Sequence, residues 1–305
     1  VYKLYINGSF VGAGPERGFN NIDRYNTFDV TDCLRRGTKN AVGAICYTTQ
    51  DKRFLFQMKI VYEDGTIQVV RSDRTWNVLN GDVVYRDLGN SGFAEKYFYS
   101  PREGLDGRNF PFGWNEPEFD KQWKSAKEKE NIRNLKASAT HNSRLYLLAP
   151  ERVVNKGGGR YFVDFGKAVT AGIQLTLEGE TGRQIEIRLG EELVEQEQVR
   201  YKMRTGNTYQ EVWTLKEGPQ TLENFGYRVF RYLELHNAPE GIGEHNIRAA
   251  VLRHPFDDNT AHFVSSDAVL NDVWEFCKYS IKATLLDVYV DTHTRERRAY
   301  EGDAL

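Results

Sequence analysis

Cysteine and histidine are scarce in this sequence, and their placement excludes two kinds of site. The three cysteines form no C-x-x-C pair, and their odd number leaves at least one thiol free, so the chain is not a disulfide-stapled scaffold. The six histidines are scattered without the spacing of metal ligands. We therefore expect no zinc or other metal centre and no cofactor.

Charge of one sign and long apolar runs are also lacking. The formal net charge is −2, so no strong field draws the chain to nucleic acid or to anionic lipid. No apolar run reaches the 18 residues of a candidate membrane helix, and no signal peptide is visible. We expect neither a nucleic-acid nor a membrane partner. The sequence opens on Val1 inside an expected strand, so we interpret it as a piece cut at both ends, which leaves the compartment unassigned.

The composition is that of a folded protein with several domains. Hydrophobic residues make up 40% and aromatic residues 13% of the 305 positions, which excludes a disordered chain. This length accommodates two or three domains. Changes of pattern divide the chain into residues 1–138, 139–255 and 256–305. We predict a mainly β fold, with two tandem antiparallel β-sandwich domains followed by the beginning of a helical domain.

Short alternating strands characterise the first of these segments. The clearest signals are hairpins around Asn7-Gly8 and around Asp64-Gly65. Residues 101–114 are rich in glycine, proline and asparagine and predict a long loop. We expect the aromatic residues of this loop to pin it to the sandwich.

The alternation restarts in the second segment after the glycines at 157–159, which predict a turn because a strand follows them. Residues 172–177 and 184–189 predict a hairpin. Glu191 and Glu192 come directly after that hairpin. We interpret them as surface acids, because general acid catalysis needs a partly desolvated carboxyl group.

Two further features complete the scaffold. Arg231 lies between two aromatic residues and is expected to cross-link strands or to contact a domain interface. From Ser265 onwards, apolar residues recur at three- and four-residue steps. This period predicts an amphipathic helix of about twenty residues with its N-cap at Ser265 or Ser266.

The densest chemistry lies in residues 291–303, which we call the signature segment. It contains four carboxylates, three arginines, one histidine and one tyrosine, and arginines directly precede and follow Glu296. Asp291, Glu296 and Asp303 suit a cup that grips a polyhydroxylated ring and protonates a leaving oxygen. On charge alone, surface ion pairs are the alternative interpretation. We interpret His293 as a polar surface residue or as a supporting residue behind the site.

The signature segment resembles the active-site signature of bacterial α-L-rhamnosidases, in which an Asp is followed five residues on by an acidic residue and twelve on by the Asp of Gly-Asp-Ala. Those positions are Asp291, Glu296 and Asp303 in this sequence. The family commonly has Cys-Pro where this chain has Thr292-His293. The likeness extends upstream, to residues 5–8, 164–166 and 230–234.

The resemblance implies an inverting glycoside hydrolase that removes terminal α-L-rhamnose. It implies a jelly-roll-like first domain similar to galactose-binding modules, a second β sandwich, and the first helix and active-site loop of a six-hairpin α/α barrel. It makes Glu296 the general acid, gives Asp291 and Asp303 the rhamnose hydroxyls, and has Arg295 orient these acids. The general base would lie later in the barrel than residue 305, so we expect the 305-residue chain alone to be inactive. The implied partner is a rhamnose-containing glycoside or polysaccharide.

Two other functions fit the same residues. One is a non-catalytic carbohydrate-binding pair of β sandwiches that retains the entry to a barrel. The other is an α/α-barrel glycosidase acting on a different sugar, which the departures at Thr292, His293 and Tyr300 leave open. Titration with L-rhamnose distinguishes the binding module from the enzyme: binding within residues 1–255 favours a binding module, and binding that depends on Asp291 and Asp303 favours the enzyme.

Overall fold

The computed structural model of the chain describes residues 1–18, 21–48, 51–92, 100–130, 134–294 and 297–299. The chain forms two compact units. Unit 1 comprises Val1–Gly81 and Pro111–Asn142, and unit 2 comprises Asp82–Phe110 and Ser143–Leu305.

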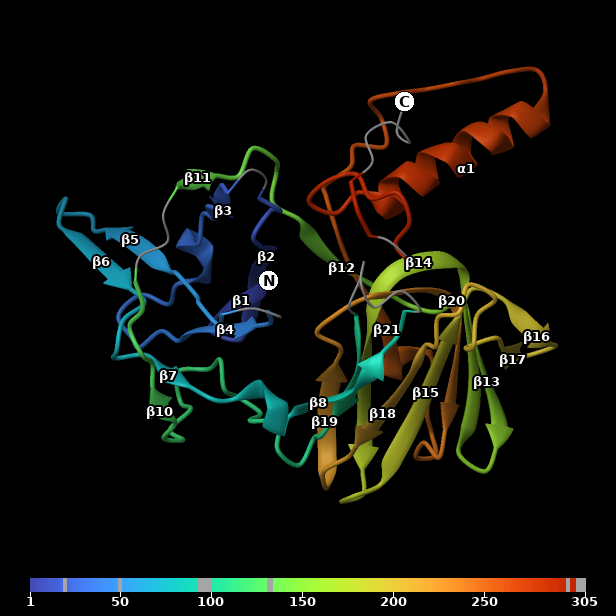
Figure 1. Cartoon of the computed structure of the whole chain (residues 1–305), viewed down its shortest axis with the longest axis horizontal. Coiled ribbons are helices and arrows are strands. Elements are labelled where there is room, and N and C mark those ends of the chain that lie inside the picture. Colours follow the sequence, from blue (N-terminus) through green and yellow to red (C-terminus); the bar gives the residue numbers. More distant parts are fainter. Residues whose placement is uncertain (19–20, 49–50, 93–99, 131–133, 295–296, 300–305) are drawn as a thin grey trace. The chain divides into compact units, whose positions relative to one another are not determined.

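Unit 1 is built from small β sheets (Figure 1). Its strands are β1 (Tyr2–Ile6), β2 (Ser9–Gly14), β3 (Asp23–Tyr25), β4 (Val42–Cys46), β5 (Gln57–Val61), β6 (Ile67–Arg71), β7 (Asn77–Val78), β10 (Lys124–Ser125) and β11 (Leu135–Ala137), with the 3-10 helix η1 at Thr31–Cys33. One sheet has the order β2-β1-β4, and the remaining strands pair as β3 with β11, β5 with β6 and β7 with β10. The pair of β3 and β11 is parallel, whereas the others are antiparallel.

Both predicted hairpins of unit 1 are confirmed. Asn7 and Gly8 connect β1 to β2 with φ of 50° and 81°, a left-handed geometry that these two residue types adopt readily. The second hairpin joins β5 to β6. The predicted pinning is confirmed for Trp114, whose ring centroid lies 5.5 Å from that of Tyr5. The same indole lies against Gly43, where an added Cβ would be 2.4 Å from the ring, so glycine is required there.

Unit 2 is a two-layer β sandwich with one α-helix among its described residues (Figure 1). Its strands are β8 (Tyr85–Asn90), β9 (Pro101–Leu105), β12 (Arg144–Leu148), β13 (Arg152–Gly157), β14 (Arg160–Gly179), β15 (Gln184–Gly190), β16 (Leu193–Glu195), β17 (Gln198–Val199), β18 (Gln210–Thr214), β19 (Gly218–Glu223), β20 (Arg228–His236) and β21 (Ile247–Arg253). The helices are η2 (Gly81–Val83), η3 (Glu244–Asn246) and α1 (Ala268–Thr284). One layer has the order β13-β14-β20-β15-β18 and the other β12-β21-β14-β19.

The long strand β14 belongs to both layers. Its first part, as far as Ala171, pairs with β20, and its second part, from Gly172, pairs with β21. The predicted hairpin of residues 172–177 with 184–189 is therefore wrong. The turn after Gly179 carries the chain from one layer to the other, so β15 pairs with β18 and β20 instead of β14. Alternation of apolar residues is the same in both arrangements, which is why the sequence did not separate them.

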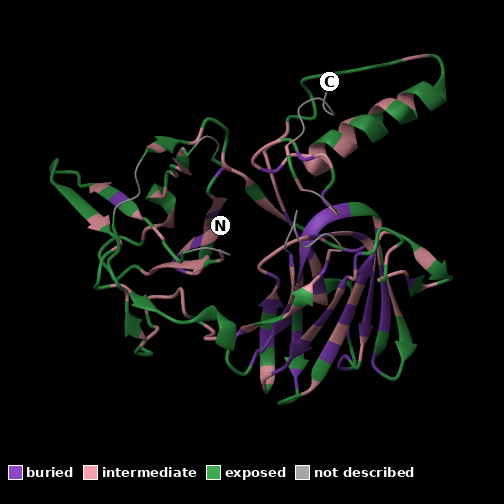
Figure 2. Ribbon diagram, in the orientation of Figure 1, coloured by how far each residue is buried: buried purple, intermediate pink, exposed green. Residues whose placement is uncertain are grey.

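The buried core is concentrated in the sandwich of unit 2 (Figure 2). Its largest fully buried side chains are Trp213, Tyr161, Tyr209, Phe162 and Phe230, which come from β14, β18, β20 and the residue before β18. Burying an aliphatic or aromatic side chain of this kind stabilises a fold by about 1.5–3 kcal/mol. Unit 2 is therefore a rigid platform for the segments that follow β21.

Two expectations outside the sandwich need correction. Residues 101–105 were predicted as part of a loop, but they form β9, because they pair with β8. The helix α1 begins one or two residues later than expected: its N-cap is Asp267, whose carboxylate accepts a hydrogen bond of 2.8 Å from the Val269 N–H. Ser265 instead accepts a hydrogen bond from the Asp267 N–H.

The apolar side of α1 is exposed. Val269, Val273 and Phe276 keep 66%, 51% and 72% of their surface, and the helix buries none of its residues completely. Among the described residues, no helix has both the length and the apolar content needed to cross a membrane.

Candidate functional site

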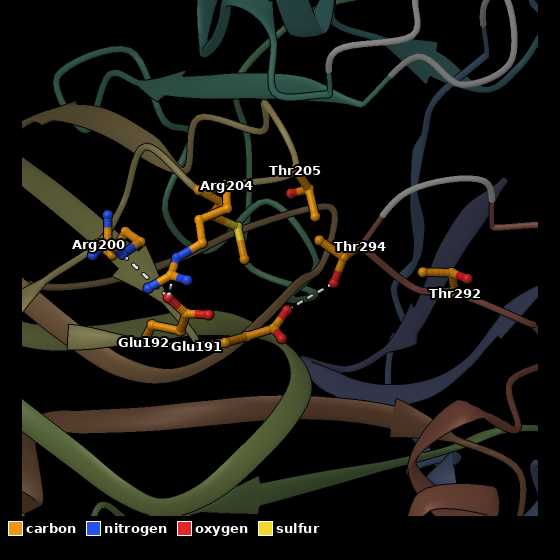
Figure 3. A pocket seen from close by; sticks show the side chains of 8 residues that line it. Glu191, Glu192, Arg200, Arg204, Thr205, Thr292 and Thr294 are labelled. Atoms are coloured by element: carbon orange, nitrogen blue, oxygen red, sulfur yellow. Dashed lines mark hydrogen bonds and ion pairs between the residues drawn. The ribbon is translucent and has the colours of Figure 1, made fainter. Parts of the chain in front are cut away.

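A cavity of about 210 Å³ lies where the sandwich of unit 2 meets the signature segment (Figure 3). Its lining comes from the end of β15, from the loop before β18 and from the signature segment: Glu191, Glu192, Arg200, Met203, Arg204, Thr205, Thr292 and Thr294. Seven of these eight side chains carry a carboxylate, guanidinium or hydroxyl group. Such groups hydrogen-bond to polyhydroxylated or charged ligands.

Glu191 faces the signature segment. Its Oε1 accepts a hydrogen bond of 2.8 Å from the Thr294 hydroxyl, and Figure 3 shows the two side chains pointing toward each other. Burial raises the pKa of Glu191, although the bond from Thr294 acts in the opposite direction. The interpretation of Glu191 as a surface acid is therefore wrong. Its hydrogen-bond partner Thr294 lies 103 positions later in the chain, beyond the reach of any local pattern.

Glu192 is the surface acid that the sequence predicts. It is exposed, and its Oε2 lies 3.2 Å from the Nε of both Arg200 and Arg204. Exposed pairs of this kind contribute about 0–1 kcal/mol each. They fix the direction of two cationic side chains at the rim of the cavity.

Hydrogen bonds within the signature segment join its first described residues to those that follow positions 295–296. The Asp291 N–H donates to the Arg298 carbonyl at 3.0 Å, and the Arg298 N–H donates to Asp291 Oδ1 at 3.2 Å. The Arg297 N–H donates to the Thr292 carbonyl at 3.0 Å. Two residues at the start of the segment are therefore bound to two residues near its middle.

Of the four predicted site residues, the structure places Asp291. Arg295, Glu296 and Asp303 lie outside the described residues. The Asp291 carboxylate also accepts a hydrogen bond of 3.0 Å from the Thr292 hydroxyl.

Two residues of the signature segment, His293 and Arg297, point into unit 2 and make contacts there. His293 is 4% exposed, and its Nε2 lies 2.8 Å from the Thr284 carbonyl, which excludes the surface interpretation and agrees with a supporting residue. The Arg297 guanidinium lies 4.1 Å from the centre of the Tyr227 ring, and burial lowers the pKa of this arginine. The sequence alone indicated no role for Arg297, which it placed only in the signature segment.

Three family models match the chain, one after another. The α-L-rhamnosidase N-terminal domain matches residues 45–145, and the bacterial α-L-rhamnosidase concanavalin-like domain matches residues 154–253. The bacterial α-L-rhamnosidase six-hairpin glycosidase domain matches residues 258–305, which contain the signature segment. The chain belongs to the α-L-rhamnosidase family. The family and the fold class predicted from the sequence are confirmed.

Relatives from the same family align with almost the whole chain. The α-L-rhamnosidase of Streptomyces avermitilis is 25% identical over 329 aligned positions, which cover 99% of this chain and 31% of that protein. The solved structure of an α-L-rhamnosidase from Dictyoglumus thermophilum has a TM-score of 0.75 at 24% identity and covers 97% of this chain and 34% of that one. The Streptomyces avermitilis enzyme in complex with L-rhamnose has a TM-score of 0.73 at 23% identity, over 97% and 30%. These structures share the fold, and the chain spans about a third of their length.

A buried cluster of charged residues lies inside the concanavalin-like region of this rhamnosidase-family chain. Glu211 on β18 is 0% exposed, and its Oε1 lies 2.9 Å from Nη2 of Arg228 at the start of β20. The Glu103 carboxylate on β9 accepts hydrogen bonds of 2.7 Å from the N–H groups of Phe225 and Gly226. Burial raises the pKa of Glu211 to about 7, against the attraction of Arg228 and with a contribution from the negative charge of Glu103.

We expect this cluster to make stability depend on pH. The folded-state pKa of Glu211 lies above its ordinary value of 4.5, so the folded state binds more protons between these values. The contribution is complete below pH 4.5 and is lost as the pH rises through about 7, with a slope of at most about 1.4 kcal/mol per pH unit. Urea unfolding at pH 5 and pH 8 checks this. The parent chain loses stability over that interval relative to Glu211→Gln, and a constant difference between the two proteins contradicts the prediction.

No metal-binding set is present among the side chains that the structure describes. Within residues 1–299, apart from the gaps given above, no three His, Cys, Asp or Glu side chains gather so as to hold an ion.

Proposed function

We propose that this chain is part of a glycoside hydrolase that removes terminal α-L-rhamnose from rhamnosides with inversion. The observation that carries the proposal is the match of the six-hairpin glycosidase domain over residues 258–305, directly after the two β domains of the same family. The Streptomyces avermitilis relative is named an α-L-rhamnosidase, and its solved structure holds L-rhamnose. The proposed substrate is accordingly a rhamnose-containing glycoside or polysaccharide.

In this proposal Glu296 is the general acid, which donates its proton to the glycosidic oxygen as the bond to the sugar breaks. Asp291 and Asp303 hold rhamnose hydroxyls, and Arg295 orients the acids. Asp291 supports this assignment, because hydrogen bonds from the Arg298 N–H and the Thr292 hydroxyl fix its carboxylate. Inversion requires a second carboxylate roughly 6.5–9.5 Å from the acid to activate water, and we assign it to a later part of the six-hairpin domain.

The domain organisation that we propose has three parts: residues 1–138, 139–255 and 256–305. The first is a jelly-roll-like sandwich, the second is the concanavalin-like sandwich, and the third begins the six-hairpin barrel. The family matches at 45–145, 154–253 and 258–305 follow this order.

The activity is tested with two proteins. A protein that carries the whole six-hairpin domain is expected to hydrolyse 4-nitrophenyl α-L-rhamnoside and to release β-L-rhamnose first, as seen by NMR. The 305-residue chain is expected to be inactive, because it lacks the proposed general base. The matching β-D-galactoside is the control for sugar class.

Each possible failure has its own meaning. Turnover by the 305-residue chain removes the need for a later base. Release of α-L-rhamnose contradicts inversion. Hydrolysis of another sugar in place of rhamnose favours the alternative glycosidase, and rhamnose binding to residues 1–255 without turnover favours the binding module.

A further inference from the structure

The two described residues that flank positions 295–296, Thr294 and Arg297, are both bound to the sandwich of unit 2. We propose that Asn207 and Arg297 are positioning residues, which fasten the signature segment to the concanavalin-like sandwich on both sides of the general acid. This inference rests on the proposed function, in which Glu296 is that acid. It gives the β domain a part in the reaction, because that domain binds the residues on either side of the proposed acid.

Asn207 holds the first side. It is 1% exposed, and its Nδ2 donates a hydrogen bond of 2.6 Å to the Thr294 carbonyl. The orientation of the Asn207 side chain is fixed, because its Oδ1 accepts a hydrogen bond of 3.0 Å from the Thr205 hydroxyl. The main-chain carbonyl of Asn207 accepts another of 2.8 Å from the Met203 N–H. A buried amide held in this way presents its N–H group at one place.

Thr294 is also bound through its side chain. Its hydroxyl donates to Glu191 at 2.8 Å (Figure 3). Its carbonyl accepts the bond from Asn207, so two different residues of the sandwich bind Thr294. One residue of the signature segment is thereby fixed in position and in rotation.

Arg297 holds the second side. Its Nη2 donates to the Tyr227 carbonyl at 3.1 Å, and its guanidinium lies 4.1 Å from the centre of the Tyr227 ring. Its Nε donates to the His293 carbonyl at 2.8 Å, which ties the two sides of the segment together. The backbone of Arg297 has a φ of 54°, a left-handed conformation that persists in a residue other than glycine where its surroundings determine it.

These attachments bear on catalysis because a general acid works only within hydrogen-bond reach of the leaving oxygen. Misplacement of a catalytic group by about 1 Å costs on the order of 10²-fold in rate. The residues that hold Thr294 and Arg297 lie in the segments just outside β15, β18 and β20, strands that contribute many of the buried core residues. The sandwich therefore serves as a fixed template for the segment.

The test uses Asn207→Ala in a protein that carries the whole six-hairpin domain. Its matched control is Asn246→Ala, which removes a similar bond of 2.7 Å from a side-chain amide to the Thr176 carbonyl, on β14. For a methyl α-L-rhamnoside, whose leaving group needs protonation, Asn207→Ala is expected to lower kcat by about 10- to 100-fold with KM within about twofold. The loss on 4-nitrophenyl α-L-rhamnoside, which leaves readily, is expected to be smaller. The control leaves both rates close to those of the parent.

Arg297 supplies a second, independent variant. Arg297→Ala is expected to show the same dependence on the leaving group. Arg297→Lys keeps a cation over Tyr227 and is expected to restore part of the rate. Equal losses on both substrates, or no loss in either alanine variant, overturn the proposal.

Hydrogen–deuterium exchange separates this inference from the proposed function. Exchange in residues 289–299 is expected to rise in Asn207→Ala and to stay unchanged in Asn246→Ala, whatever the activity of the protein. Inactivity of the parent on every rhamnoside overturns the proposed function, whereas unchanged exchange in Asn207→Ala overturns the attachment itself.

Discussion

Glu296→Gln, in a protein that carries the whole six-hairpin domain, is expected to lower kcat for an alkyl α-L-rhamnoside by about 10²–10⁴-fold. The amide of glutamine keeps the size of the side chain but has no proton to give to the leaving oxygen. Aryl rhamnosides with good leaving groups are expected to lose much less, because their oxygen leaves without protonation. Steady-state kinetics over a series of leaving groups measure this difference.

The control for that experiment is Glu217→Gln. Glu217 accepts hydrogen bonds from the N–H and the hydroxyl of Thr181 in the turn between β14 and β15, and it has no part in the proposed chemistry. A Glu296→Gln protein with parental rates on alkyl rhamnosides would show that another group is the acid.

Arg228→Met is expected to lower the free energy of unfolding by about 3–5 kcal/mol at pH 8. Its guanidinium is 2% exposed and pairs with Glu211, and it also donates to the carbonyls of Tyr227 and Pro101 and to the Ser100 hydroxyl. Without it, a fully buried carboxyl group must stay ionised with no counter-charge or take up a proton. Urea unfolding of the 305-residue chain measures the loss.

Two comparisons make this result specific. Arg152→Met removes a pair with Glu197 whose arginine is half exposed, and it is expected to cost no more than about 1 kcal/mol. Addition of Glu211→Gln to Arg228→Met is expected to recover part of the stability, because the unpaired carboxylate is gone. Similar losses in Arg152→Met and Arg228→Met would show that burial of the charge is not the cause.

The sequence predicted those parts of the fold that depend on neighbouring residues. The Asn7-Gly8 hairpin was found because the turn is encoded at the turn itself. The helix α1 was found from its period, but its N-cap was placed one or two residues early, since Ser265, Ser266 and Asp267 are all good capping residues in succession. Arg231 was expected to cross-link strands, and it pairs with Asp164 on the adjacent strand with both Nε and Nη2.

What the sequence missed depends on residues far apart in the chain. Glu191 accepts a hydrogen bond from Thr294, and Thr294 accepts one from Asn207, 87 positions away. Asn207 follows Thr205-Gly206 and has the local character of a turn residue, which conceals its contact with the signature segment. The sequence alone indicated no role for Arg228, because its partner Glu211 lies on another strand.

The course of β14 limits how this part of the protein can change. Strand side chains alternate between the two faces, so the insertion or deletion of a single residue within β14 would exchange inward and outward positions on everything that follows it in the strand. Since β14 runs through both layers, such a shift by one residue would turn apolar side chains toward solvent in one layer. The other layer would undergo no compensating change. We expect homologous chains to vary in the length of their surface loops and to keep the number of residues in β14.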